Sequence, residues 1–261
     1  MPKFAANISL MFPEVPFLER FAAARSAGFK AVEFQFPYAF AVKDIADRVK
    51  DNGLEVILFN LPPGDFDKGE RGIACLPGRE DEFRSGIGRM LEYAKAVNCR
   101  KINCLSGIKP QGLDREAALG TLASNLAIAA DALGKEGVQL LVEPINVVDI
   151  PGFLLNRSSD GIAMLDRVGS SNIWLQYDVY HMQRMEGEIS ATVQRLLPRI
   201  GHIQIADAPQ RFEPGTGEVN YRHVLNHIDA IGYTGWIGCE YKPRTTTVEG
   251  LRWIADHGFS L

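Results

Sequence analysis

Short apolar stretches rich in β-branched residues alternate with longer amphipathic stretches along the whole chain. The apolar stretches cover residues 4–11, 31–36, 55–61, 101–106, 139–145, 173–179, 200–206 and 236–241. Most are almost continuously apolar, which is typical of strands covered on both faces. Between them apolar residues recur three and four positions apart, and this spacing predicts helices with one buried stripe, as at Phe83, Ile87, Met90, Ala94 and Val97. The predicted order is a strand followed by a helix, repeated eight times.

Polar residues end the last four predicted strands. They are Glu143, Asp178, Gln204 and Glu240, at spacings of 35, 26 and 36 residues. Each spacing is close to the ~30 residues of one strand–helix unit. Such units form either an open sheet or a closed barrel, and polar residues that converge at one mouth favour the barrel. We predict an α/β fold, a single (β/α)8 TIM barrel domain over residues 1–261, with its active site at the C-terminal face of the strands.

Composition and net charge indicate which classes of binding partner the protein can have. The chain is 46% hydrophobic and 23% charged, as in an ordinary globular protein, and its net charge is −4. This balance gives no basic footprint, so we expect no nucleic-acid partner and no membrane partner. We find no apolar leader, no apolar run of about 18 residues and no CxxC pair, so we expect a cytoplasmic protein with free thiols. A homo-oligomer is compatible with the sequence, which does not define the oligomeric state.

The four strand-end residues predict a divalent metal site. Three carboxylates and an amide at one mouth would repel each other and lose solvation unless a cation lay between them. Oxygen ligands suit Mg²⁺ or Mn²⁺, whereas zinc prefers Cys and His. Glu143 and Glu240 could then act as an acid/base pair that moves a proton between adjacent carbons while the metal stabilises an enediolate. This chemistry interconverts aldoses and ketoses.

Four further residues are candidates for binding the substrate. His181 lies three positions after Asp178 and could orient a hydroxyl group. Arg211, Lys242 and Arg71 follow predicted strands and could hold a carboxylate, and arginine is the better suited through its planar fork. Two long connections, residues 62–78 and 207–220, should overhang the mouth because they follow strand ends.

The chain also resembles a known family. The segments that carry the resemblance are FNLPPGDFDKGERGIACLPGRE, KINCL, EPIN with DIPGF, QYDVYHMQRMEGE, HIQIAD, EPGTGE and GCEYKP. They are similar to the hydroxypyruvate isomerase family and the closely related 2-oxo-tetronate isomerases, within the xylose-isomerase-like barrels. The resemblance implies metal ligands at Glu143, Asp178, Gln204 and Glu240, and acid/base glutamates at Glu143 and Glu240. It implies that the small keto or hydroxy acid substrate is hydroxypyruvate, converted to 2-hydroxy-3-oxopropanoate (tartronate semialdehyde).

Other functions remain open from the sequence. A four-carbon 2-oxo-tetronate isomerase differs from the three-carbon enzyme only in the depth of its pocket. A ketose 3-epimerase would use the same enediolate. An abasic-site endonuclease on the same barrel would need a histidine-rich zinc site, and only His181 and His202 lie near strand ends. A non-catalytic binding protein would have no use for two glutamates facing one metal.

Overall fold

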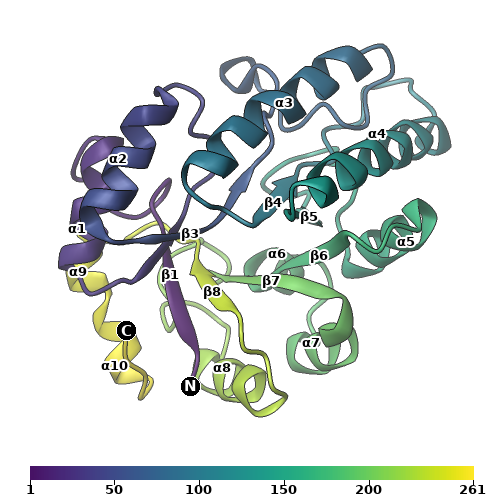
Figure 1. The fold of residues 1–261 in the computed structure, drawn as a ribbon. Helices are drawn as coiled ribbons and strands as arrows, with labels where there is room; N and C mark the ends of the chain where they lie inside the picture. Colours follow the sequence, from purple (N-terminus) through teal and green to yellow (C-terminus); the bar gives the residue numbers. More distant parts are fainter.

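The eight strands form one closed parallel barrel in sequence order (Figure 1). The computed structural model describes residues 1–261. Each strand pairs with the next, and β8 pairs with β1, which places Ala5 opposite Gly238. The predicted (β/α)8 barrel is therefore confirmed. The strands are β1 (Lys3–Asn7), β2 (Ala31–Glu33), β3 (Glu55–Asn60), β4 (Lys101–Cys104), β5 (Gln139–Val142), β6 (Ile173–Asp178), β7 (Ile200–Ile205) and β8 (Trp236–Cys239).

Helices surround the barrel and cover the outer face of the strands (Figure 1). The predicted stripe at Phe83, Ile87, Met90 and Ala94 is buried in one of them, α3. The helices are α1 (Arg20–Ser26), α2 (Val42–Asn52), α3 (Glu80–Ala96), α4 (Arg115–Lys135), α5 (Ser158–Val168), α6 (Val179–Met185), α7 (Ile189–Leu196), α8 (Tyr221–Ala230), α9 (Thr247–Gly250) and α10 (Arg252–Asp256), with 3₁₀ turns η1 (Phe17–Glu19), η2 (Phe66–Lys68) and η3 (Leu197–Arg199).

One helix, α4, is long and apolar enough by composition to cross a membrane. In the barrel it packs beside α3 and α5 and against β5. Its apolar side chains Leu122, Leu126 and Leu133 are fully buried. The composition of α4 is therefore explained by packing in the barrel wall.

Side chains alternate between the outer core and the barrel interior, as the two-residue period of a strand requires. Outward residues such as Phe4, Val142 and Ile203 join the main core under the helices. Inward residues near the strand starts, such as Ala5 and Leu141, belong to a separate apolar cluster that fills the bottom of the barrel. The polar residues at the strand ends share this inward direction, so they meet above an apolar floor.

Several strands end earlier than the apolar pattern predicts. β2 was expected to reach residue 36, but it ends at Glu33. The next residue, Phe34, packs its ring between Phe21 and Phe59 in the outer core. The apolar pattern therefore continues past the hydrogen-bonded strand. In the same way β5 and β8 end one residue before Glu143 and Glu240, so both glutamates lie just above the sheet.

Candidate active site

Three buried carboxylates lie together at the C-terminal mouth of the barrel, from Glu143, Asp178 and Glu240. A neutral donor holds one oxygen of each, and this leaves the other oxygen for the space between them. Asn103 Nδ2 donates to Glu143 Oε2 over 2.8 Å, the Tyr180 backbone N–H to Asp178 Oδ1 over 2.8 Å, and Gln35 Nε2 to Glu240 Oε1 over 2.9 Å.

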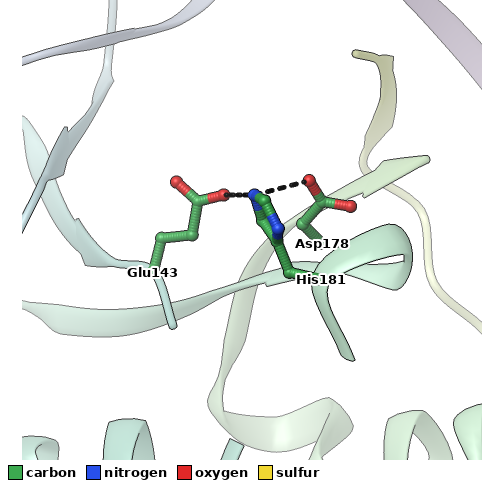
Figure 2. Close-up of side chains that lie close together, drawn as sticks. All are labelled: Glu143, Asp178 and His181. Atoms are coloured by element: carbon green, nitrogen blue, oxygen red, sulfur yellow. Dashed lines mark ion pairs between the residues drawn. The ribbon is translucent and has the colours of Figure 1, made fainter. Parts of the chain in front are cut away.

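His181 and Arg211 lie among the remaining carboxylate oxygens. The Nε2 atom of His181 is 3.7 Å from Glu143 Oε1 and 3.5 Å from Asp178 Oδ2, so the ring stands between the two carboxylates (Figure 2). Nη2 of Arg211 is 2.6 Å from Glu240 Oε2 and 3.5 Å from Asp178 Oδ2. Arg211 adopts a left-handed backbone conformation, with φ of 62°, in the loop after β7. A single guanidinium therefore contacts two of the three carboxylates.

Burial and mutual repulsion perturb the ionisation of these groups. Burial raises the pKa of Glu143 well above its ordinary value, and the charges of Glu240 and Asp178 raise it further. Burial raises the pKa of Asp178 to about 7 and also raises that of Glu240, although Arg211 opposes both shifts. Burial lowers the pKa of His181 well below its ordinary value, which favours the neutral ring. These carboxylates resist ionisation unless a cation compensates for their charge.

The donor set fits a hard divalent cation. Ligand atoms of Glu143, Asp178 and His181 all lie within 4.8 Å of one another. Glu240 lies outside this group, and Arg211 bridges it to Asp178. Carboxylate oxygens at one mouth are the ligands that Mg²⁺ and Mn²⁺ prefer.

Gln204 lies in register with Asp178 on the neighbouring strand. Its amide is bonded deeper in the barrel: Nε2 donates to Glu33 Oε1 over 2.7 Å, and Oε1 accepts from Gln176 Nε2 over 2.6 Å. The Gln204 oxygen thus uses one of its two lone pairs for Gln176. Its role as a ligand therefore stays a prediction.

A fourth buried carboxylate, Glu33, was missed in the sequence. It is fully buried at the end of β2 and accepts from Asn7 Nδ2 over 2.9 Å as well as from Gln204. His202 Nε2 lies 2.7 Å from its other oxygen. A Cβ atom at Gly238 would lie 2.3 Å from the Glu33 carboxylate, so only glycine leaves room for it. The sequence does show Glu33 as a carboxylate within an apolar stretch. Because the predicted strand ran on to residue 36, Glu33 did not stand out as a residue at a strand end.

One cavity of about 220 Å³ opens over the carboxylates. Glu143 and Glu240 line this cavity, whereas Asp178 does not. The four predicted substrate contacts, Arg71, His181, Arg211 and Lys242, also border this cavity, and its apolar wall includes Leu10, Phe36, Leu105, Ile145 and Ile150. The volume is below the ~300–1,000 Å³ of sites for drug-sized ligands, which indicates a small metabolite.

The three cations at the cavity differ in how they are paired. Arg211 forms an ion pair with Glu240. Arg71, from the long loop after β3, rests its guanidinium 3.7 Å from the centre of the Phe66 ring and donates only to backbone oxygens of Phe66 and Glu70. Lys242, after β8, lines the cavity and forms no ion pair. Arg71 and Lys242 are therefore the cations left for an acidic ligand.

Comparisons with known proteins identify the family. The pattern of the xylose isomerase-like TIM barrel family matches residues 21–257. The chain is 50% identical to hydroxypyruvate isomerase of Escherichia coli, covering 97% of this chain and 98% of that protein. It is 49% identical to 2-oxo-tetronate isomerase of Cupriavidus necator, covering 98% and 99%.

Solved structures agree on the fold. A Brucella melitensis protein described as AP endonuclease, family 2 superimposes with a TM-score of 0.95 at 45% identity, covering 98% of this chain and 99% of that one. An L-ribulose 3-epimerase, at 24% identity and a TM-score of 0.73, shares the barrel alone. The chain thus belongs to the xylose isomerase-like TIM barrel family, and it is an isomerase similar to hydroxypyruvate isomerase and 2-oxo-tetronate isomerase.

Proposed function

We propose that this protein interconverts hydroxypyruvate and 2-hydroxy-3-oxopropanoate with the help of a divalent metal. The observation that carries the proposal is the cluster of three buried carboxylates at the barrel mouth, each with one oxygen held by a neutral donor, where ligand atoms of Glu143 and Asp178 lie within 4.8 Å of each other. Glu143, Asp178 and Glu240 would hold Mg²⁺ or Mn²⁺, with Gln204 as the predicted fourth ligand. When bound, the cation would supply Lewis-acid polarisation of the substrate carbonyl and compensate for the charge of an enediolate.

The two glutamates are suited to move the protons. Both border the cavity, and Asn103 and Gln35 each hold one oxygen of their glutamate. The second oxygen of Glu240 accepts from Arg211 Nη2 over 2.6 Å. One glutamate takes a proton from C3 of hydroxypyruvate, and the electron pair of that C–H bond forms the C2–C3 double bond of the enediolate. The other glutamate then delivers a proton to C2 while the O3 proton passes to O2, which leaves a hydroxyl group on C2 and forms a carbonyl at C3. No oxidant is required.

Charge and size support a small keto acid as substrate. Arg71 and Lys242 carry unpaired positive charges at the cavity, which suits one carboxylate. The second candidate is 2-oxo-tetronate, because a relative of nearly equal identity is named as its isomerase. One extra carbon changes selectivity by only ~1–3 kcal/mol in a site of this kind.

The endonuclease alternative has less support. The related Brucella melitensis structure carries that description. However, the site here has three carboxylates and a single neighbouring histidine, whereas zinc prefers nitrogen and sulfur ligands. The net charge of −4 also disfavours DNA binding.

Proton NMR in D₂O tests the proposal. Metal-stripped protein is incubated with hydroxypyruvate, with and without Mg²⁺ or Mn²⁺. We expect metal-dependent appearance of tartronate semialdehyde or deuterium at C3, and kinetics with 2-oxo-tetronate then rank the two substrates. Absence of both signals with every divalent metal would contradict the assigned reaction, and cleavage of abasic DNA would favour the endonuclease.

A further inference from the structure

The side chain of Asn146 connects the strand that carries Glu143 to His181. Asn146 is fully buried three residues after Glu143. Its Oδ1 atom accepts two backbone N–H groups of its own loop, from Val148 over 3.1 Å and from Asp149 over 2.8 Å. These two donors require an acceptor at that position, so they fix which way the amide faces.

The amide nitrogen of Asn146 consequently faces the other way. Nδ2 donates to Asp149 Oδ2 over 3.1 Å and lies 2.7 Å from Nδ1 of His181. If the amide were reversed, its NH₂ group would meet the two backbone N–H donors. Nδ1 of His181 must therefore accept a hydrogen bond, and an accepting Nδ1 carries no proton. The ring therefore carries its proton on Nε2.

We infer that Asn146 is a positioning residue that holds His181 in its Nε2–H tautomer, as a hydrogen-bond donor and not a metal ligand. By distance alone Glu143, Asp178 and His181 resemble a metal-binding triad (Figure 2). A protonated ring nitrogen has no free lone pair for a metal. Metal-bound histidines usually donate from their second nitrogen to a carboxylate or carbonyl, whereas here that nitrogen meets an N–H donor.

This tautomer gives His181 a role that rests on the proposed function. Nε2 lies between the carboxylates beneath a cavity that His181 itself borders. An N–H group held there would donate to a substrate oxygen on which negative charge develops, which is the arrangement of an oxyanion-stabilising donor.

A second contact keeps the donor aligned with the ring. Asp149, which accepts from Asn146, also accepts from the Tyr180 hydroxyl over 2.7 Å and from Arg184 Nη1 over 2.8 Å. Tyr180 and Arg184 lie on α6, the helix that carries His181. The Asn146 loop and the His181 helix are therefore held together at His181, Tyr180 and Arg184.

The tautomer can be read directly by ¹⁵N–¹H long-range NMR of ¹⁵N-histidine-labelled protein with saturating Mg²⁺. The His181 signal is assigned as the one lost in His181→Gln. We expect the Nε2–H pattern in the wild type. A His181 ring with the Nδ1–H pattern, or with Nε2 bound to Mg²⁺, would overturn the inference. This measurement needs no turnover, so it is independent of whether the proposed substrate is right.

Substitutions at Asn146 then test what sets the tautomer. In Asn146→Asp the carboxylate still accepts the two backbone N–H groups but can no longer donate to Nδ1, so we expect a shift to Nδ1–H and a fall in kcat of ~100-fold with a small change in KM. Asn146→Ala, which removes the contact without adding charge, should give a mixture of tautomers.

Asn52→Asp, at the exposed end of α2, is the matched control because it adds the same charge far from the ring. We expect it to retain the Nε2–H pattern. An unchanged pattern in Asn146→Asp, or an equal change in Asn52→Asp, would overturn the role of Asn146.

Discussion

The two halves of the barrel end their strands with different chemistry. The ends of β5 to β8 carry Glu143, Asp178, Gln204 and Glu240, whereas those of β1 to β4 carry Asn7, Glu33, Asn60 and Asn103. All are buried, so the difference lies in their partners. Asn103 donates to Glu143, and Glu33 with Asn7 holds the amide of Gln204. The half from β5 to β8 supplies the carboxylates of the proposed site and is called the charged half. The half from β1 to β4 supplies side chains that hold Glu143 and Gln204 in place and is called the positioning half.

The largest expected effect concerns the charged half. Glu143→Gln and Glu240→Gln keep the shape of each side chain but remove its ability to accept a proton. We expect each to lower kcat by ~10²–10⁴-fold, the usual contribution of an acid/base group, with an unchanged circular dichroism spectrum. Glu92→Gln, on the exposed face of α3, is the matched control and should keep full activity. Near wild-type turnover in either variant would remove that residue from the acid/base role.

Metal binding should depend on the same half. A cation that binds only the folded protein adds ~2.7 kcal/mol of stability at a hundredfold excess over its Kd. We expect Mn²⁺ or Mg²⁺ to raise the unfolding temperature of the wild type and to leave that of Asp178→Asn unchanged. Asparagine can still accept the Tyr180 backbone N–H, so the fold is preserved. An equal metal-dependent shift in both proteins would place the cation elsewhere.

The pH dependence of the metal-free protein sharpens this test. Asp178 has a folded pKa of about 7, above the ~3.9 of an unfolded aspartate. The folded state therefore binds the proton more tightly, and the stability that this provides is lost as pH rises from about 4 through about 7. We expect Asp178→Asn to gain stability over the wild type at pH 8 but not at pH 4 in urea unfolding without metal. A pH-independent difference would contradict the raised pKa.

Recognition of the substrate carboxylate should depend on residues that lie outside both sets of strand ends. Arg71→Met keeps the contact with Phe66 but removes a charged donor, which is worth ~1.5–3 kcal/mol. We expect KM for hydroxypyruvate to rise at least ~10-fold with kcat retained, and Lys242→Met to act in the same direction. Arg84→Met, on exposed α3, is the control. An unchanged KM in both cavity variants would leave the carboxylate to Arg211.

The sequence predicted the charged half of the barrel better than the positioning half, for physical reasons. Carboxylates after apolar strands stand out because an unpaired buried charge is costly. Asn103 and Asn60 carry no charge, so the sequence does not mark them out. Their role depends on which side chain each contacts in the fold, and the sequence does not show this. Glu33 was hidden because Phe34 and Phe36 continued the apolar pattern past the end of β2. Arg211 reaches Glu240 from a residue with a left-handed backbone conformation, and the sequence around Arg211 does not predict that conformation.

The smallest expected effect tests the positioning half directly. Asn103→Leu removes the donor to Glu143 Oε2, and also an amide oxygen that has no hydrogen-bond partner. Because leucine is similar in size, we expect the fold to be kept, with a loss of ~1–3 kcal/mol from the buried Glu143 oxygen that is left without a donor. Glu143 would keep its proton-accepting oxygen but lose its alignment, so kcat should fall by about tenfold, the value of one hydrogen bond to a charged group. A loss as large as that of Glu143→Gln would show that Asn103 shares in the chemistry, and the division between the two halves would no longer hold.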